Sequence, residues 1–265
     1  MPWYLPFLAA AAYLAAALLL SRRLGSGHHG GRAGALAAAA LAIAAHTGLH
    51  VAQFAETGPD LHFVPSLSLA ALLIAALATA IAVWRPVEAI GIVAYPIAAL
   101  CALAYGWHPH ESGATPAGWQ IALHVVLALL AFAVLSIAAL IAIMLELQER
   151  ALRQRRVATV MRMFPPLSLV EGLLFHLIAA GFVLLSATVL TGVLFIHDWF
   201  AQHLVHKTVL TLLAWAVFGV LLFGHWRWGW RGIRAARFTL AGITLLLLGF
   251  LGSKFVLEVL LQRAG

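Results

Sequence analysis

Long runs of apolar residues dominate the sequence, and polar residues are confined to the short segments between them. A helix that crosses the apolar core of a bilayer needs about 20 such residues. Strands of a membrane barrel would be about ten residues long and would alternate in polarity, and runs such as 34–45 and 239–251 do not alternate. The pattern predicts eight transmembrane helices, at about 3–20, 33–53, 64–83, 87–105, 118–145, 169–195, 205–226 and 237–260.

These runs predict an all-α, polytopic transmembrane helix bundle that forms a single integral membrane domain over residues 1–265. We interpret the first run as a span and not as a cleavable signal peptide, because Arg22 and Arg23 follow its apolar residues instead of preceding them. The run at 118–145 leads into a charged segment, which we expect to stay helical until Pro165 and Pro166 stop it.

The basic residues indicate how the spans are oriented. Cytoplasmic loops of membrane proteins are enriched in Lys and Arg, and 13 of the 16 basic residues follow the first, third, fifth and seventh runs. The other side keeps only Lys207, Lys254 and Arg263. We therefore expect both termini on the outer, periplasmic side. The same placement explains the net charge of +7 without a nucleic-acid partner.

The composition excludes several classes of protein. Hydrophobic residues make up 64% of the chain and charged residues 9%, whereas about 25% of a typical soluble domain is charged. A soluble enzyme, a disordered chain and a DNA-binding domain are thereby excluded. Cys101 is the single cysteine, which excludes a disulfide framework and a CxxCH haem-attachment site. Motifs of ATP-driven pumps and membrane proteases are absent from the sequence.

Thirteen histidines against nine acidic residues indicate the candidate chemistry. The helical rise places His124 roughly 9 Å from the outer end of its span, His50 within a turn of the outer end of its own, and His206 at the outer boundary. His46 shares a face with His50, one turn deeper. An ionisable residue within a span suggests a functional site, and imidazole is a common ligand of haem iron, zinc and copper.

A smaller histidine group lies on the inner side, with His176 early in one span and His225 at the end of the next. His206 and His225 are about 28 Å apart on one helix and cannot bind one metal centre together. They would serve two ligands, or one ligand that moves between two sites. Glu88 and Glu171, near the inner face, could pair with loop arginines.

The tryptophans and lysines add further candidates. Most of the nine tryptophans fall at the expected membrane interfaces, where an aromatic belt is typical. Trp199, which follows His197 and Asp198, and Trp215, inside a span, are better candidates for a flat aromatic platform. Lys207 either extends to the headgroups or receives an anionic group such as a haem propionate.

Four segments in the second half of the chain carry a family resemblance. They are Trp119–Val125, which contains His124, then Asp198–Trp215, Gly229–Gly232 and Gly252–Glu258. These segments resemble the CcsA/CcmC-type cytochrome c assembly proteins, and in particular their YpjD-like branch. The similarity covers about 118–260 well and the first four spans in general character. It implies a haem-handling protein of the bacterial inner membrane.

The resemblance also implies a site. In the family, outward-facing histidines hold haem above a tryptophan-rich external segment for delivery to apocytochrome, and the first of these histidines matches His124. Lys207 and Trp215 fall on similar positions of the following helix, and His225 lies near the family's inner membrane histidine. The family's WWD pattern is missing, and Ser253-Lys254-Phe255 stands where its second external histidine would be. We infer that His206 replaces that histidine.

We therefore expect a multi-pass inner-membrane protein that binds or delivers haem, as haem b, without the turnover of an enzyme. His124 and His206 would be the axial ligands of the haem iron. Around them, His50, Trp199, Lys207 and Trp215 would line the outer site, while His176 and His225 would form an inner station. The expected partners are membrane lipid, haem, and apocytochrome or other cytochrome assembly factors.

Two other classes of function remain open at this point. The outer histidines, together with Glu56, Asp60 and Asp198, could serve a divalent-metal transporter or a transport accessory. Alternatively, the chain is a non-catalytic structural subunit of a membrane complex, and its histidines satisfy hydrogen bonds between packed helices.

Overall fold

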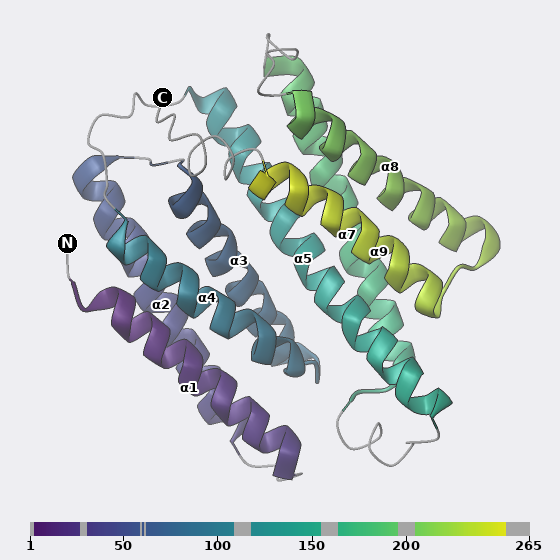
Figure 1. Cartoon of the computed structure of the whole chain (residues 1–265), viewed down its shortest axis with the longest axis horizontal. Helices are drawn as coiled ribbons and strands as arrows, with labels where there is room; N and C mark the ends of the chain where they lie inside the picture. The colour runs from purple at the N-terminus through teal and green to yellow at the C-terminus, as the bar shows by residue number, and fades with distance from the viewer. Residues whose placement is uncertain are drawn as a thin grey trace. The chain divides into compact units, whose positions relative to one another are not determined.

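The computed structural model describes residues 3–26, 31–58, 60, 62–108, 118–154, 164–195 and 205–252. Eight helices in this part of the chain are long and apolar enough to cross a membrane, which confirms the predicted all-α class and the number of spans. A short π-helix, η1 (Leu248–Gly252), extends the last of them. The eight helices (Figure 1) are α1 (Leu5–Ser26), α2 (Arg32–Thr57), α3 (Phe63–Trp84), α4 (Ala89–Trp107), α5 (Trp119–Arg153), α7 (Leu167–Phe195), α8 (Val205–Trp228) and α9 (Gly232–Leu247).

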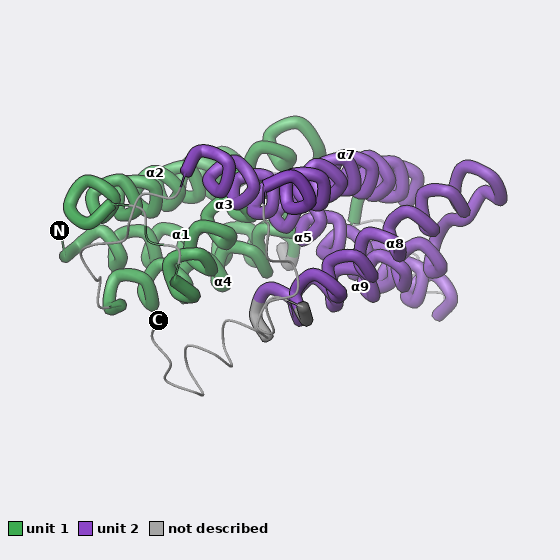
Figure 2. Tube along the Cα trace, turned by 90° about the horizontal axis from the view of Figure 1, so that it is seen from above, with its two compact units in different colours: residues 1–116, 156–165 green, residues 117–155, 166–265 purple. Residues whose placement is uncertain are grey.

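The chain divides into two compact units (Figure 2). Unit 1, residues 1–116 and 156–165, contains α1 to α4, and unit 2, residues 117–155 and 166–265, contains α5 and α7 to α9. In unit 1, α1 and α3 both pack against α2 and α4. In unit 2, α5 and α8 both pack against α7 and α9. Each unit is thus a ring of four helices. That the two units form a single membrane domain stays a prediction.

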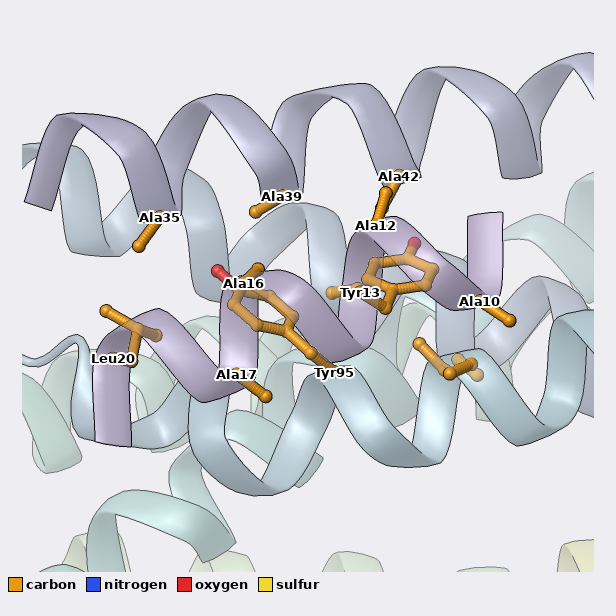
Figure 3. Packing of buried hydrophobic residues seen from close by; sticks show 14 residues of the cluster. Ala10, Ala12, Tyr13, Ala16, Ala17, Leu20, Ala35, Ala39, Ala42 and Tyr95 are labelled. Carbon is orange, nitrogen blue, oxygen red and sulfur yellow. The ribbon is translucent and has the colours of Figure 1, made fainter. Parts of the chain in front are cut away.

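Small residues form the core of unit 1. Alanines of α1, α2, α3 and α4 surround the buried rings of Tyr13 and Tyr95 (Figure 3). These two rings stack with their centroids 5.9 Å apart, and the Tyr95 hydroxyl lies 2.9 Å from Oγ1 of Thr79. Small side chains let membrane helices approach closely, so that dispersion forces and buried hydrogen bonds hold them together.

Close helix contacts in unit 2 depend on glycine. A Cβ atom added to Gly181 would lie 2.5 Å from the buried Leu135 side chain of α5, and one added to Gly242 would lie 2.6 Å from the ring of Phe218 on α8. At both positions a neighbouring side chain occupies the space that any larger residue would need. The four-helix packing of unit 2 therefore requires glycine at these two points.

The observed boundaries of two helices, α5 and α9, differ from the predicted spans. The charged continuation of α5 is helical to Arg153, and the following residues 155–163 lie outside the described residues. The last span begins at Gly232, five residues earlier than expected. Its first turns carry Arg234 and Arg237, which are exposed; long basic side chains at the end of a span commonly keep their charge at the interface. A span predicted from its apolar residues alone does not extend over charged residues, so the prediction began the helix too late.

Candidate functional site

His124 lies half-buried on the second turn of α5, and its Nδ1 is 3.1 Å from Oγ1 of Thr191 on α7. The Thr191 hydroxyl has one hydrogen, which it donates to the carbonyl of Ala187 (2.9 Å) or of Thr188 (3.0 Å). When either carbonyl takes this hydrogen, the Thr191 oxygen can accept a hydrogen bond from His124, and the N–H of the imidazole is then on Nδ1. Nε2 then carries the lone pair, as a metal-binding histidine requires.

Gly192 follows Thr191 and lies beside the His124 ring. A Cβ atom at this position would be 3.3 Å from Cε1 and 3.7 Å from Nδ1 of the imidazole. Thr191 thus holds the ring, while Gly192 adds no side chain against its edge. We did not predict a role for these two residues from the sequence. The available signal was a Thr-Gly pair near the C-terminal end of α7.

Trp215 is fixed against α7 by two contacts. Its Nε1–H donates to Oγ of Ser186 at 2.8 Å, and its ring stacks on Phe182 with centroids 5.5 Å apart. The Ser186 hydroxyl donates in turn to the Phe182 carbonyl. Ser186 precedes Thr191 by five residues, or about 7.5 Å along α7. Trp215 therefore contacts α7 at a deeper level than His124 does.

The start of α8 carries other predicted site residues. Lys207 is half-buried there, and its carbonyl oxygen lies 3.8 Å from the position of a Cβ atom on Gly249 in η1, so α8 and η1 are close at this end. π-helical turns are frequent at functional sites, and the apolar pattern gave no sign of this one. The His206 side chain and all of Trp199 lie outside the described residues.

His50 belongs to a polar network in unit 1. It stacks on His46 one turn away, with centroids 5.3 Å apart, as their spacing predicted. Both Nε2 atoms meet Oγ of Ser68 on α3, at 2.8 Å from His46 and 3.1 Å from His50. Nδ1 of His46 lies 3.4 Å from the hydroxyl of Tyr13, and the His50 ring stacks on Tyr105 at 4.3 Å. Both nitrogens of the fully buried His46 ring are therefore hydrogen-bonded.

The two histidines that we predicted near the inner face, His176 and His225, donate from Nδ1. His225 donates to the carbonyl of Trp230 at 2.8 Å, and its ring stacks on Phe175 of α7 with centroids 3.6 Å apart. His176 is exposed and donates to the carbonyl of Gly172 at 2.6 Å. The lone pair of each ring is therefore on Nε2. That these two histidines form an inner station stays a prediction.

The two inner glutamates differ in their partners. Glu88 accepts from Arg23 at 3.1 Å and lies 2.6 Å from Arg32, so the suggested pairing with arginine is confirmed for this residue. Glu171 instead accepts a hydrogen bond from the backbone N–H of Gly232 at 2.9 Å. This N–H belongs to the first turn of α9, where backbone donors have no partner within the helix.

The described part of the chain contains no group of three His, Cys, Asp or Glu side chains that could hold a metal ion. Of the acids suggested as metal ligands, Asp60 forms a 2.7 Å contact with Nδ1 of His62. Asp198 lies outside the described residues. The divalent-metal hypothesis therefore stays open.

Comparison with known proteins shows similarity to a family and to individual membrane proteins. The family model described as "Cytochrome C assembly protein" matches residues 33–261. The chain is 39% identical over 137 residues to "Inner membrane protein YpjD" of Escherichia coli strain K12, which is 52% of either chain. It is 37% identical over 155 residues to an "Uncharacterized 28.8 kDa protein in nifR3-like 5'region" of Azospirillum brasilense, which is 58% of this chain and 57% of that protein.

The family match extends over more of the chain than the matches to individual proteins do. The chain spans about half the length of the curated relatives it matches, and no solved structure matches it significantly. Its eight apolar helices and its similarity to an inner membrane protein identify it as a multi-pass protein of the inner membrane. The family model covers most of its length, from the start of α2 to beyond η1. The chain belongs to the cytochrome C assembly protein family.

Proposed function

We propose that this protein holds haem at an outward-facing site in unit 2, with Nε2 of His124 as an axial ligand of the iron. The observation that carries the proposal is the 3.1 Å contact between Nδ1 of His124 and the Thr191 hydroxyl; with the N–H on Nδ1, Nε2 keeps its lone pair for the iron. A ligating histidine commonly donates its other N–H to a protein acceptor, which fixes both its tautomer and its orientation. Membership in a cytochrome assembly family supports haem as the ligand.

The neighbouring residues have proposed roles that suit their chemistry. Trp215, held by Ser186 and Phe182, would form an aromatic wall of the site. Lys207 would neutralise a haem propionate. The other proposed members of the site are His206 as the second axial ligand and Trp199 in the lining, with His176 and His225 as an inner station. His50 belongs to unit 1, and its place in the lining stays a prediction from the sequence.

The proposed haem is haem b, and the proposed activity is binding or delivery without turnover. Cys101 is the single cysteine, so the chain cannot form the two thioether bonds of a CxxCH attachment. The distribution of arginines supports an orientation with both termini and His124 on the periplasmic side. Haem held there would be accessible to an apocytochrome or to another assembly factor.

Absorbance spectra of the purified protein test the proposal. We expect a Soret band in the wild type, a weaker band in His124→Ala, and no band in His124→Ala/His206→Ala. His62→Ala is the matched control, because His62 lies near the outer end of α3 and contacts Asp60. This control should retain the full band. Full haem retention in the double variant would overturn the proposal.

Elemental analysis of the same samples separates the alternatives. Iron should fall in parallel with the Soret band across the histidine variants. Another transition metal that is lost with the histidines, while no porphyrin is present, would favour metal transport. Spectra and metal content that do not change in any variant would favour a structural subunit.

A further inference from the structure

A polar groove opens at the end of unit 2 that lies farthest along α5 from His124. It has a volume of about 580 Å³ and is formed by the end of α5, the start of α7 and the connection between α8 and α9. This volume lies within the usual range for ligand-binding sites. Its lining includes Arg153, Arg231 and Arg234, together with Trp228 and Trp230. None of these residues takes part in the proposed outer haem site.

The connection between α8 and α9 is held in one conformation by its own contacts. Gly229 has φ +66°, which a residue with a side chain rarely adopts. The Trp230 N–H donates to the carbonyl of Gly224 at 3.2 Å, and its carbonyl accepts from Nδ1 of His225. The rings of Trp228 and Trp230 stack with centroids 5.7 Å apart. The groove is therefore preformed on this side.

The carboxylates of the groove are bound within the protein, whereas its arginines face outward. Glu171 accepts from the backbone N–H of Gly232, and Glu149 lies 3.9 Å from Arg153. Arg234 lies over the Trp230 ring, with 5.2 Å between the guanidinium carbon and the ring centroid. Arg231 is exposed, and no carboxylate in the described part of the chain lies within 4 Å of its guanidinium group. The groove thus offers positive charge to a ligand.

The position of the groove indicates which anion it meets. It lies where α8 ends at Trp228 and α9 begins at Gly232, which is where these spans reach the membrane surface. Trp226 and Trp228 are 80% and 60% exposed, and exposed tryptophans at the ends of spans lie at the level of the lipid headgroups. Basic pockets between membrane helices at this level bind acidic headgroups.

We infer that this groove binds the phosphate of an anionic phospholipid headgroup through the guanidinium groups of Arg231 and Arg234, with Arg153 at its rim. Guanidinium presents paired N–H donors that match two phosphate oxygens. The stacked tryptophans hold the connection at headgroup depth and support one of the two arginines. A free phosphate has the same oxygens, so the experiment separates the two sources.

Titration of the full-length protein in a neutral detergent tests the inference. The probes are short-chain phosphatidylglycerol, short-chain phosphatidylcholine and inorganic phosphate, with binding followed by thermophoresis. Phosphatidylglycerol should bind more tightly than the other two. Arg231→Gln/Arg234→Gln should weaken its binding about 30-fold, from the usual contribution of two basic residues near an anionic lipid surface.

Two further variants separate a local site from general charge and from misfolding. Arg85→Gln/Arg237→Gln also removes two exposed arginines near the ends of spans, but neither lines the groove, so it should bind phosphatidylglycerol like the wild type. Arg231→Lys/Arg234→Lys keeps the charge and should retain most of the binding if the groove is intact.

Three results would overturn the inference. They are equal binding of the two lipids, equal loss of binding in the two glutamine variants, and binding of inorganic phosphate as tightly as phosphatidylglycerol. Haem content is measured in every variant and should not change. Because lipid binding and haem content are measured separately, a failure of the haem proposal would not change the outcome of the lipid-binding test.

Discussion

Replacing Thr191 with valine tests how His124 is positioned. Valine has nearly the same shape as threonine but removes the hydroxyl oxygen that lies 3.1 Å from Nδ1 of His124. Loss of the partner that orients a metal-binding histidine typically weakens metal binding 10- to 100-fold, which corresponds to about 1.4–2.7 kcal/mol. We expect the apparent affinity for haem to fall by this factor in a titration followed by Soret absorbance.

Thr188→Val provides a matched control on the same helix. Thr188 is also buried, one turn earlier, and its hydroxyl donates to the Leu184 carbonyl. Only its backbone is hydrogen-bonded to His124, and valine keeps that backbone. Both variants remove one buried hydroxyl from α7, so their effects on stability should be similar. Haem affinity should fall only in Thr191→Val. Unchanged affinity in that variant, or an equal loss in Thr188→Val, would refute the role assigned to the hydrogen bond.

Three further changes are measured as the free energy of unfolding in detergent, followed by circular dichroism. Glu88→Gln should lower the free energy of unfolding by about 2 kcal/mol, because two arginines lose the buried carboxylate that they share. Its control is Glu146→Gln, which removes an exposed ion pair and should cost less than about 0.5 kcal/mol. Gly181→Ala should cost about 1–3 kcal/mol by overlap with a buried leucine, whereas Gly172→Ala, which meets open space, should be neutral or slightly stabilising. Ser68→Ala should cost about 2 kcal/mol, because two imidazoles lose one hydroxyl partner. An effect of equal size in a test variant and its control would contradict the first two assignments, and an unchanged stability in Ser68→Ala would contradict the third.

The sequence predicts the helices well because the membrane imposes their length. Each span must be apolar for about 20 residues, and this signal does not depend on its neighbours. Because the spans are apolar along most of their length, the sequence pattern does not show which of their faces pack together. Because α7 carries apolar residues around its whole circumference, its pattern does not indicate that Thr191 faces α5 while Ser186 faces α8. Contacts such as that between His124 and Thr191, 67 positions apart, arise only when the helices pack.

Depth in the membrane identifies candidate histidines, but hydrogen bonding separates their roles. His46 and His124 both lie within spans, so the cost of burying an ionisable group marks both as candidates. In His46 both ring nitrogens are engaged, by Tyr13 and Ser68, so the imidazole acts as a bridge between helices and has no lone pair for a ligand. His124 contacts the Thr191 hydroxyl through Nδ1 and is also hydrogen-bonded to the backbone of Thr188, and no described residue is recorded as a partner of its Nε2. Hydrogen bonding at both ring nitrogens therefore argues against His46 as a ligand, which its depth alone does not, and His124 remains a candidate.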